Sequence, residues 1–489
     1  MANNTSENLL IGFDLGTSAV KAVLSDTEGN VIGQASRKVH LICTEEGFIE
    51  LDAQFYYEEI CSICRELVSL VPEAKNIRAI CFSGATGNTL LLDGEYKPLI
   101  RAISWMDMRS VGMDEVLYPG FDLSSVYDKM GWPYGGTFPL AHLGWVKNHK
   151  PELWKEAKHF SMLNDFLYYK LCGRLVVDYS KASTFFLQNQ IERKWDEDIL
   201  NLLGIEEKRL PSLVAPGTSC GKITQVASEE TGLDGETVVV TGSFDHPSAA
   251  RSVGIFKEGE LLISAGTSWV IFTPIRDRNM ALKGSMLVDP FLSPSGCWGA
   301  MFALTAITKR MDEYLENCIG SSSTESVLAR FDRLASEAEI GTEGLFLNPL
   351  QQPYADMKEK IQNIKPKNIA RALMEGVVFM TRYKLEKLIE LTGKPISKIV
   401  FTGGPTKSPI WSTILADVLQ QTVVIPEIEQ HSGAMGAVIM AGIGSGLYSD
   451  ESEGFERVRS GERVIEPDQK NSQRYQKIYI HYKKQFELH

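Results

Sequence analysis

The sequence predicts an α/β protein built from two related domains, and three observations lead to this prediction. Its 489 residues exceed the size at which a single hydrophobic core stops growing, so at least two domains are expected. Short apolar runs typical of strands alternate with longer segments of helical periodicity. A Gly-Thr-Ser turn between two apolar runs occurs at residues 16–18 and again at 266–268. This spacing is too long for a solenoid repeat, and we expect each domain to present one such hairpin to a shared cleft.

The first hairpin is predicted over residues 9–24, followed by a further polar turn and apolar pair that complete a three-strand meander. Gly16 lets a ligand approach the backbone, and the hydroxyls of Thr17 and Ser18 can donate to phosphate oxygens. Asp14 lies where the strand enters the turn, a position suited to hold Mg²⁺ through water. Taken alone, an ordinary hairpin turn explains this pattern equally well.

A candidate substrate loop follows the next predicted strand. The sequence predicts a helix over residues 52–71 and a buried strand over 77–83, which ends in Gly-Ala-Thr-Gly-Asn. Loops at strand ends are the usual ligand-binding positions of an open sheet, so Thr86 and Asn88 are candidate substrate contacts.

Trp105, Asp107 and Arg109 alternate along one short segment. In an extended chain all three side chains would point to one side and form a wall suited to a polyhydroxylated ligand. A surface ion pair between Asp107 and Arg109 is an equally good explanation of this segment by itself.

An acidic residue, Asp245, comes just after a predicted strand over residues 236–240 and before a helix rich in small residues. This position suits a general base. Asp245 followed by His246 and Pro247 is equally typical of a helix N-cap with proline in the first turn, and taken alone the cap is the simpler interpretation.

In the second half of the chain, a strand is predicted over residues 345–347 and a long helix over 367–391. A strand over 399–401 then feeds a Gly-Gly turn and a further helix. Such a turn offers open backbone and amide donors to a nucleotide, although the Walker spacing is absent. A Gly- and Ala-rich helix over 432–446 permits close packing.

Composition limits the function classes. A net charge of −12 and a pI near 5.3 argue against binding to nucleic acid or an anionic membrane. The polar N-terminus has no signal-peptide pattern, and no apolar run is long enough to cross a bilayer. Eight irregularly spaced cysteines fit a reducing cytosol, and the Cys61–Cys64 pair lies in a helical pattern with no second ligand pair. We therefore expect a cytoplasmic protein.

Taken together, the motifs resemble those of the FGGY carbohydrate kinases. The resemblance rests on residues 14–18, Asp245, residues 266–268 and residues 403–411, which occur in the family's order over nearly the whole chain. Three further segments match the family, at residues 105–109, 178–183 and 371–376. The resemblance implies two actin-like ATPase domains of the ribonuclease H type, with mixed sheets flanked by helices and a ligand cleft between them. The implied domains are residues 1–243 and 244–489.

The resemblance also implies the ligands and their contacts: ATP, Mg²⁺ and a small sugar or polyol that is phosphorylated on a hydroxyl, with Asp245 as the base. The implied nucleotide contacts are Asp14, Gly16, Thr17, Ser18, Lys21, Gly266, Thr267, Ser268, Gly403, Gly404 and Lys407, and Asp14 also serves the metal. The implied sugar contacts are Thr86, Asn88, Trp105, Asp107, Arg109 and His246. A small-molecule sugar is the expected partner and a homodimer is a possible assembly.

Some residues depart from the family's pattern. Xylulose kinases typically carry Gly-Gln-Met-His-Gly at residues 84–88, His246 replaces a usual Asn or Gln, and His142 replaces a usual lysine. These departures argue against D-xylulose and leave another ketose, a polyol or a sugar acid open. Two other classes share some of these features: an actin-like ATPase of the chaperone type, and a sugar-binding regulator without kinase activity. The absence of a following peptide-binding domain speaks against the first class, and the presence of Asp14, Asp245 and both hairpins speaks against the second.

Overall fold

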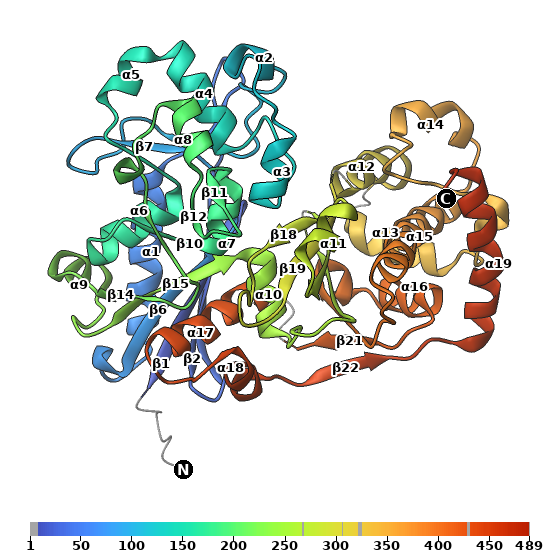
Figure 1. Cartoon of the computed structure of the whole chain (residues 1–489). Coiled ribbons are helices and arrows are strands. Elements are labelled where there is room, and N and C mark those ends of the chain that lie inside the picture. The colour runs from blue at the N-terminus through green and yellow to red at the C-terminus, as the bar shows by residue number, and fades with distance from the viewer. Residues whose placement is uncertain (1–7, 267, 306, 321–324, 428–430, 489) are drawn as a thin grey trace. The chain divides into compact units, whose positions relative to one another are not determined.

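The computed structural model describes residues 8–266, 268–305, 307–320, 325–427 and 431–488. The chain forms two compact units (Figure 1). The first unit comprises Met1–Gly254, Met286–Gly299 and His431–Arg459, and the second comprises Ile255–Ser285, Ala300–Gln430 and Ser460–His489. Neither unit is a continuous stretch of chain, unlike the predicted domains 1–243 and 244–489.

The first unit is organised around a six-stranded mixed sheet. Its strands in spatial order are β14 (Ser219–Lys222), β15 (Val238–Phe244), β6 (Ile77–Gly84), β1 (Leu9–Leu15), β2 (Ala19–Asp26) and β3 (Val31–Lys38). β1, β2 and β3 pair antiparallel, whereas β1, β6 and β15 run parallel. The predicted meander is therefore confirmed, with β1 inside the sheet.

The two faces of β1 contact different helices because side chains alternate along a strand. Leu9, Ile11 and Phe13 point into a core shared with α1 (Ala53–Val68) and α6 (Leu163–Cys172). On the other face Gly12 leaves room for α17 (Ser432–Gly444), since an added Cβ would lie 2.0 Å from the carbonyl oxygen of Ala434. Figure 1 shows α17 beside β1, although the two are far apart in sequence.

The other elements of this unit surround the sheet or extend from it. They are β4 (Ile42–Cys43), β5 (Ile49–Leu51), β7 (Leu90–Leu92), β8 (Ala102–Ile103), α2 (Asp114–Leu117), α3 (Ser125–Met130), α4 (Pro139–His149), α5 (Pro151–Glu156), β9 (His159–Ser161), β10 (Val176–Asp178), α7 (Tyr179–Ala182), β11 (Gln188–Asn189), β12 (Lys194–Trp195), α8 (Glu197–Leu203), β13 (Ser212–Val214), α9 (Gln225–Thr231), α10 (Asp245–Ser252), β18 (Leu287–Asp289) and α18 (Glu451–Val458).

The second unit repeats this strand order. Its sheet places β19 (Trp298–Leu304), β17 (Trp269–Ile275), β16 (Glu260–Ala265), β20 (Lys398–Gly403), β21 (Val423–Pro426) and β22 (Glu462–Ile465) side by side. β16 pairs antiparallel with β17 and parallel with β20, as β1 does with β2 and β6. The prediction of two related domains is thus confirmed by topology.

The helices of the second unit include the long predicted one. They are α11 (Arg278–Lys283), α12 (Ile307–Tyr314), α13 (Val327–Ser336), α14 (Tyr354–Ile361), α15 (Pro366–Thr392), α16 (Pro409–Leu419) and α19 (Gln469–Gln485). α15 begins with a proline in its first turn and ends at Gly393 in the left-handed conformation, as the sequence predicts.

One predicted strand is wrong. Residues 345–347 form no strand but lie against α15, where the carbonyl oxygen of Leu347 occupies the space that a Cβ on Gly376 would need, 1.9 Å away. Leu347 is buried without sheet neighbours, whereas Leu345 and Phe346 are only partly buried, and a short apolar run does not distinguish such a segment from a strand.

Candidate active site

The first Gly-Thr-Ser turn joins β1 to β2. The amide of Gly16 donates to the carbonyl oxygen of Ala19 at 3.0 Å and closes the turn. Gly16 and Thr17 are partly buried, and Ser18 is exposed. The turn therefore presents a short, accessible stretch of backbone with two hydroxyl groups at the end of a rigid strand pair.

Asp14 lies on the α17 face of β1. Its carboxylate touches the backbone of α17 at Gly433, where an added Cβ would lie 2.8 Å from its Oδ2 atom. Lys21 is its partner on β2. Burial and the nearby charge of Asp245 raise the pKa of Asp14 to about 6, and Lys21 lowers it in part. Asp14 and Asp245 are thus close enough to interact electrostatically.

Asp245 is the first residue of α10 and directly follows β15. The N-cap position belongs to Phe244, which makes no side-chain cap bond. Within the described residues, the hydrogen bond of the Asp245 carboxylate is from the adjacent amide of His246, at 2.8 Å, and 34% of its side chain is exposed. An N-cap would instead accept from an amide two or three residues further on. The cap interpretation is therefore not met by the geometry, and the carboxylate is accessible to a ligand.

His246 stays close to Asp245. Its Nε2 atom lies 3.8 Å from the Asp245 Oδ1 atom, and its ring meets Phe244 edge-on. The histidine is thus placed to contact whatever the carboxylate contacts.

Three of the predicted sugar contacts, Thr86, Asn88 and Trp105, line one cavity of the first unit together with Gly16 and Thr17. The rest of its lining comes from Leu15, Leu41, Leu51, Tyr56, Ala85, Ser104, Leu163 and Asn164. Thr86 accepts a hydrogen bond from Thr184 at 2.7 Å, and Asn88 accepts one from the amide of Leu163 at 2.7 Å. The cavity thus lies between the candidate substrate loop and the first Gly-Thr-Ser hairpin.

Asp107 and Arg109 do not line this cavity. Both oxygens of the Asp107 carboxylate are occupied, by the Arg109 guanidinium and amide and by the amide of Ile49. Burial alone would raise the pKa of Asp107, but these hydrogen bonds outweigh it and hold that pKa below its ordinary value. Arg109 also pairs with Glu50 and stacks on Phe48. The pair is a buried structural one, neither a sugar-facing wall nor a surface ion pair.

The second hairpin joins β16 to β17. The amide of Gly266 donates to the carbonyl oxygen of Ser268 at 3.0 Å, and Gly266 is exposed. Thr267, which we predicted to contact nucleotide, lies outside the described residues.

Gly403 ends the strand beside this hairpin. It pairs with Ala265, and its φ of 101° favours glycine. A Cβ there would lie 2.0 Å from the Ala265 carbonyl oxygen. Gly404 begins a 3₁₀ turn that ends at Lys407, whose side chain is exposed. The hairpin and the Gly-Gly turn therefore lie on neighbouring strands.

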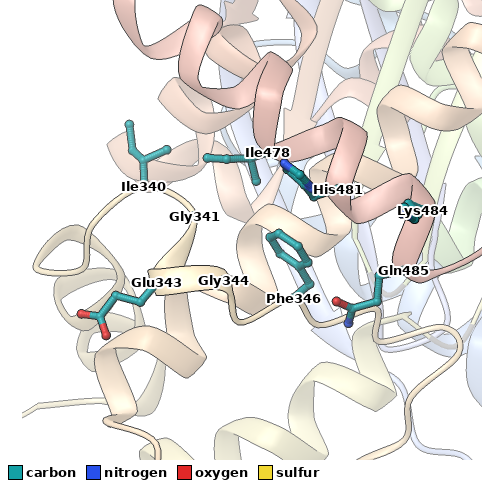
Figure 2. A pocket seen from close by; sticks show the side chains of 9 residues that line it. All are labelled: Ile340, Gly341, Glu343, Gly344, Phe346, Ile478, His481, Lys484 and Gln485. Atoms are coloured by element: carbon teal, nitrogen blue, oxygen red, sulfur yellow. The ribbon is translucent and has the colours of Figure 1, made fainter.

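A separate pocket of the second unit lies between residues 340–346 and α19 (Figure 2). Ile340, Phe346 and Ile478 contribute its apolar surface, and His481 lines it from the helix. None of the predicted site residues lines it, so it is distinct from the candidate site.

The described residues contain no helix long and apolar enough to span a membrane, and no group of three or more His, Cys, Asp or Glu side chains arranged to hold a metal. Cys61 and Cys64 are buried in α1, and burial raises the pKa of the Cys61 thiol to about 11. The Cys-x-x-Cys pair is therefore part of the core.

Duplicated sheets with a Gly-Thr-Ser hairpin in each define a two-domain, actin-like fold. The chain matches the model for the N-terminal domain of the FGGY family of carbohydrate kinases over residues 9–251. It matches the model for the C-terminal domain of that family over residues 351–445. The protein belongs to the FGGY family and is a carbohydrate kinase, which transfers phosphate from ATP.

Full-length relatives support this assignment. The chain is 29% identical over 491 residues to the xylulose kinase of Bacillus subtilis, covering 97% of this chain and 96% of that one. It is 26% identical over 457 residues to the gluconokinase of Bacillus subtilis, covering 90% and 87%. Among solved structures, a ligand-bound xylulose kinase from Lactobacillus acidophilus matches with a TM-score of 0.85 and 23% identity, over 98% of this chain and 97% of that one. The solved structure shows the fold, and the actin-like prediction is confirmed.

Proposed function

We propose that the protein phosphorylates one hydroxyl of a small carbohydrate, with Asp245 as the general base. The observation that carries this proposal is the position of the Asp245 carboxylate. It leaves the end of a buried strand, is partly exposed, makes no cap bond, and shares its surroundings with Asp14. A general base must be accessible to the reacting proton, and a helix cap need not be.

The two Gly-Thr-Ser hairpins are proposed to bind the ATP phosphates. Each hairpin lies at the end of a strand pair and has the sequence Gly-Thr-Ser, and backbone amides and hydroxyls of such a turn are donors that suit phosphate oxygens. Gly403, Gly404 and Lys407 are proposed to lie beside the adenosine. The neighbouring positions of Ala265 and Gly403 in the sheet support a single nucleotide contact surface on the second unit.

The donor set fits Mg²⁺ delivered with the nucleotide. Mg²⁺ is usually held by one or two carboxylates, several waters and substrate phosphates rather than by a complete protein cage. Asp14 supplies one such carboxylate. Burial, and after it the negative charge of Asp245, raise the pKa of its carboxyl, and a bound cation would favour the ionised form. Bound Mg²⁺ would neutralise charge on the phosphates.

The reaction requires one bond to form and one to break. The sugar hydroxyl oxygen forms a bond to the γ-phosphorus of ATP, and the bond from that phosphorus to the bridging oxygen of ADP breaks. The hydroxyl proton passes to the Asp245 carboxylate. The protein's task is to align these groups, since positioning and electrostatics supply most of the catalysis in such transfers.

The cavity beside the first hairpin, about 20 Å³ in volume, is too small to enclose a sugar, and its residues are proposed to form one wall of the sugar site. Thr86 and Asn88 offer polar groups for hydroxyls, and Trp105 offers an apolar surface. None of its lining residues carries a charged side chain. A carboxylate substrate would need a cationic partner there. The cavity therefore favours a neutral ketose or polyol over a sugar acid.

A panel assay tests the substrate class. ADP release is measured with purified protein, Mg–ATP and a series of ketoses, polyols and sugar acids. We expect turnover to depend on one neutral sugar. Turnover with a sugar acid alone would contradict the substrate class, and sugar-independent turnover would point to an ATPase.

The variant Asp245→Asn tests the base. The amide keeps the size of the side chain but cannot take a proton, so kcat should fall by roughly 10²–10⁴-fold while nucleotide binding persists. Asp450→Asn is the matched control, because Asp450 does cap a helix and accepts from the amide of Glu453 at 2.9 Å. It should leave kcat and thermal stability nearly unchanged. A folded Asp245→Asn variant with near-parental kcat would remove Asp245 from the mechanism.

A further inference from the structure

The pairing of β15 with β6 is interrupted by a β-bulge just before Asp245. β15 follows β6 in regular parallel register up to Thr241, opposite Phe82, and pairs again at Phe244, opposite Gly84. Two residues of β15 therefore face one residue of β6. Such a bulge redirects the chain and interrupts the ladder of backbone hydrogen bonds.

Side chains of α6 and α7 replace the interrupted ladder on one side of the bulge. The hydroxyl of Tyr168 accepts from the amide of Gly242 at 3.0 Å. Lys181 Nζ donates to the carbonyl oxygen of Phe82 at 2.7 Å and to the Tyr168 hydroxyl at 3.0 Å. It also pairs with Asp178 at 3.0 Å. All of these side chains are fully buried, so the backbone groups they bind have no access to water.

Ser180 performs the same task one residue before the candidate base. Its hydroxyl accepts from the amide of Phe244 at 3.0 Å and donates to the Asp289 carboxylate at 2.6 Å. Ser180 and Asp289 are both fully buried. The amide of Phe244 is thus fixed by a side chain that is itself fixed by a buried acceptor.

We infer that Ser180 and Lys181, two consecutive residues of α7, are positioning residues for Asp245. They hold the two sides of the β15 bulge and so set the direction in which the Asp245 side chain leaves the strand. The inference rests on the proposed role of Asp245. Because a displacement of about 1 Å in a reacting group can cost about 10²-fold in rate, a pair of buried hydrogen bonds at this point matters for catalysis as well as for folding.

The chain provides a matched control at the other end of the same strand pair. The hydroxyl of Thr237, also buried, donates to the carbonyl oxygen of Ile77 at 2.9 Å. It therefore links the amino end of β6 to the residue just before β15, well away from Asp245 in the sheet. Thr237→Val removes a buried side-chain hydrogen bond between the same two chain segments without touching the bulge.

The test compares Ser180→Ala with Thr237→Val, in the parent protein and in the Asp245→Asn variant. Thermal unfolding, nucleotide binding and steady-state phosphorylation are measured on each. We expect both single variants to lose stability, but only Ser180→Ala to lower kcat, by at least about tenfold, with the KM for ATP within a few-fold of the parent. In the Asp245→Asn background the effect of Ser180→Ala on kcat should disappear, because residues that act as one unit are not additive.

Two results would overturn the inference. One is a Ser180→Ala variant that loses stability as Thr237→Val does and keeps its kcat. The other is an equal loss of kcat from Ser180→Ala with and without Asp245, which would show that the serine does not act through the base. Full activity of Asp245→Asn itself would instead overturn the proposed function. Lys181→Met is a second variant with the same expected pattern. If the unpaired Asp178 charge prevents Lys181→Met from folding, Ser180→Ala alone still decides the test.

Discussion

Asp14 and Asp245 are the two side chains on which the proposed chemistry depends, and the fold holds them differently. Asp14 is anchored in a strand, between Lys21 on the neighbouring strand and the glycine backbone of α17. Asp245 lies at a strand-to-helix junction, where its carboxylate accepts a hydrogen bond from the next amide. A fixed position, such as that of Asp14, suits a carboxylate that binds a metal, and an accessible position, such as that of Asp245, suits a general base.

The raised pKa of Asp14 predicts a pH-dependent effect of Asp14→Asn on stability. The folded-state pKa of Asp14, about 6, lies above the ordinary value of 3.8. Ionisation of this carboxyl therefore destabilises the folded state at pH 7, and this destabilisation is absent below about pH 4. Without nucleotide, Asp14→Asn should therefore raise the melting temperature by about 2–4 °C at pH 7 and not at pH 4. Thermal unfolding at the two pH values measures this.

The control is Asp93→Asn in an exposed turn, where hydrogen bonds from the amides of Lys97 and Glu95 lower the pKa of the carboxyl. That variant should not gain stability at pH 7. An equal gain in both variants would mean that net charge, and not the site of Asp14, is responsible.

Asp107 is expected to matter for stability and little for sugar binding. Asp107→Asn leaves the Arg109 guanidinium, of which 6% is exposed, without its main partner. Breaking such a buried pair typically costs about 3–5 kcal/mol. Chemical denaturation should show a loss of that order, with the KM for sugar within a few-fold of the parent.

Glu152→Gln, which breaks an exposed pair with Lys155, is the control and should cost less than about 1 kcal/mol. A stable Asp107→Asn variant with a strongly raised KM for sugar would return Asp107 to the substrate site.

Among the secondary-structure elements, the adjacent carboxyl ends of the inner strands β16 and β20 carry the second hairpin and the Gly-Gly turn. The two glycines of that turn meet opposite constraints. Gly403 has a positive φ and no room for a side chain, whereas a Cβ on Gly404 meets nothing within 4 Å. Gly403 therefore allows the close approach of β20 to β16, and Gly404 leaves its backbone accessible to a ligand.

Alanine at each glycine separates these tasks. Gly403→Ala should lower the melting temperature and raise the KM for ATP, because the strand ends must move apart. Gly404→Ala should keep the melting temperature, and it should raise the KM for ATP if the adenosine lies against that backbone. Nucleotide titration and thermal unfolding measure both. Normal stability of Gly403→Ala would contradict the close approach to Ala265.

Much of the local structure was predictable from sequence because its signals are local. The Gly-Thr-Ser hairpins, the ends of α15 and the helix at residues 432–444 all follow from short-range patterns of apolar, proline and glycine residues. The strand before Asp245 was predicted over residues 236–240 but spans Val238–Phe244, and no sequence pattern marks the bulge near its end.

The long-range contacts of the site were not predictable. The buried pairing of Asp107 with the amide of Ile49 depends on chain segments 58 residues apart. From sequence, Ser180 is only part of a segment that resembles the family, whereas its hydrogen bond to Asp289 joins residues 109 positions apart. Such contacts follow from the packing of distant elements, which neither periodicity nor turn chemistry encodes.

At the scale of the whole molecule, the first unit depends on a segment from the end of the chain. α17 supplies a face of Gly and Ala residues that touches β1, β15 and α10, at Gly12, Val240 and Ser248. Without it, the apolar and small-residue face of the first sheet is uncovered. Family domain boundaries drawn along the sequence therefore do not coincide with units that can fold alone.

Two shortened chains test this dependence. A chain ending at residue 430 lacks α17 and α18, and we expect its first unit to lack a cooperative unfolding transition. A chain ending at residue 459 keeps both helices and loses β22 and α19, which belong to the second unit. It should retain a transition for the first unit in calorimetry or hydrogen exchange. A cooperative first unit in the shorter chain would contradict the role of α17.

The return of residues 431–459 to the first unit has a consequence for synthesis. Domains generally fold in order as the ribosome releases them, beginning with the N-terminal one. Here one face of the sheet that carries Asp14 is covered by α17, so this face cannot be buried until translation has passed residue 444. Nascent chains stalled before that point should expose this face to chaperones, and the second unit is completed later still, because residues 460–489 also belong to it.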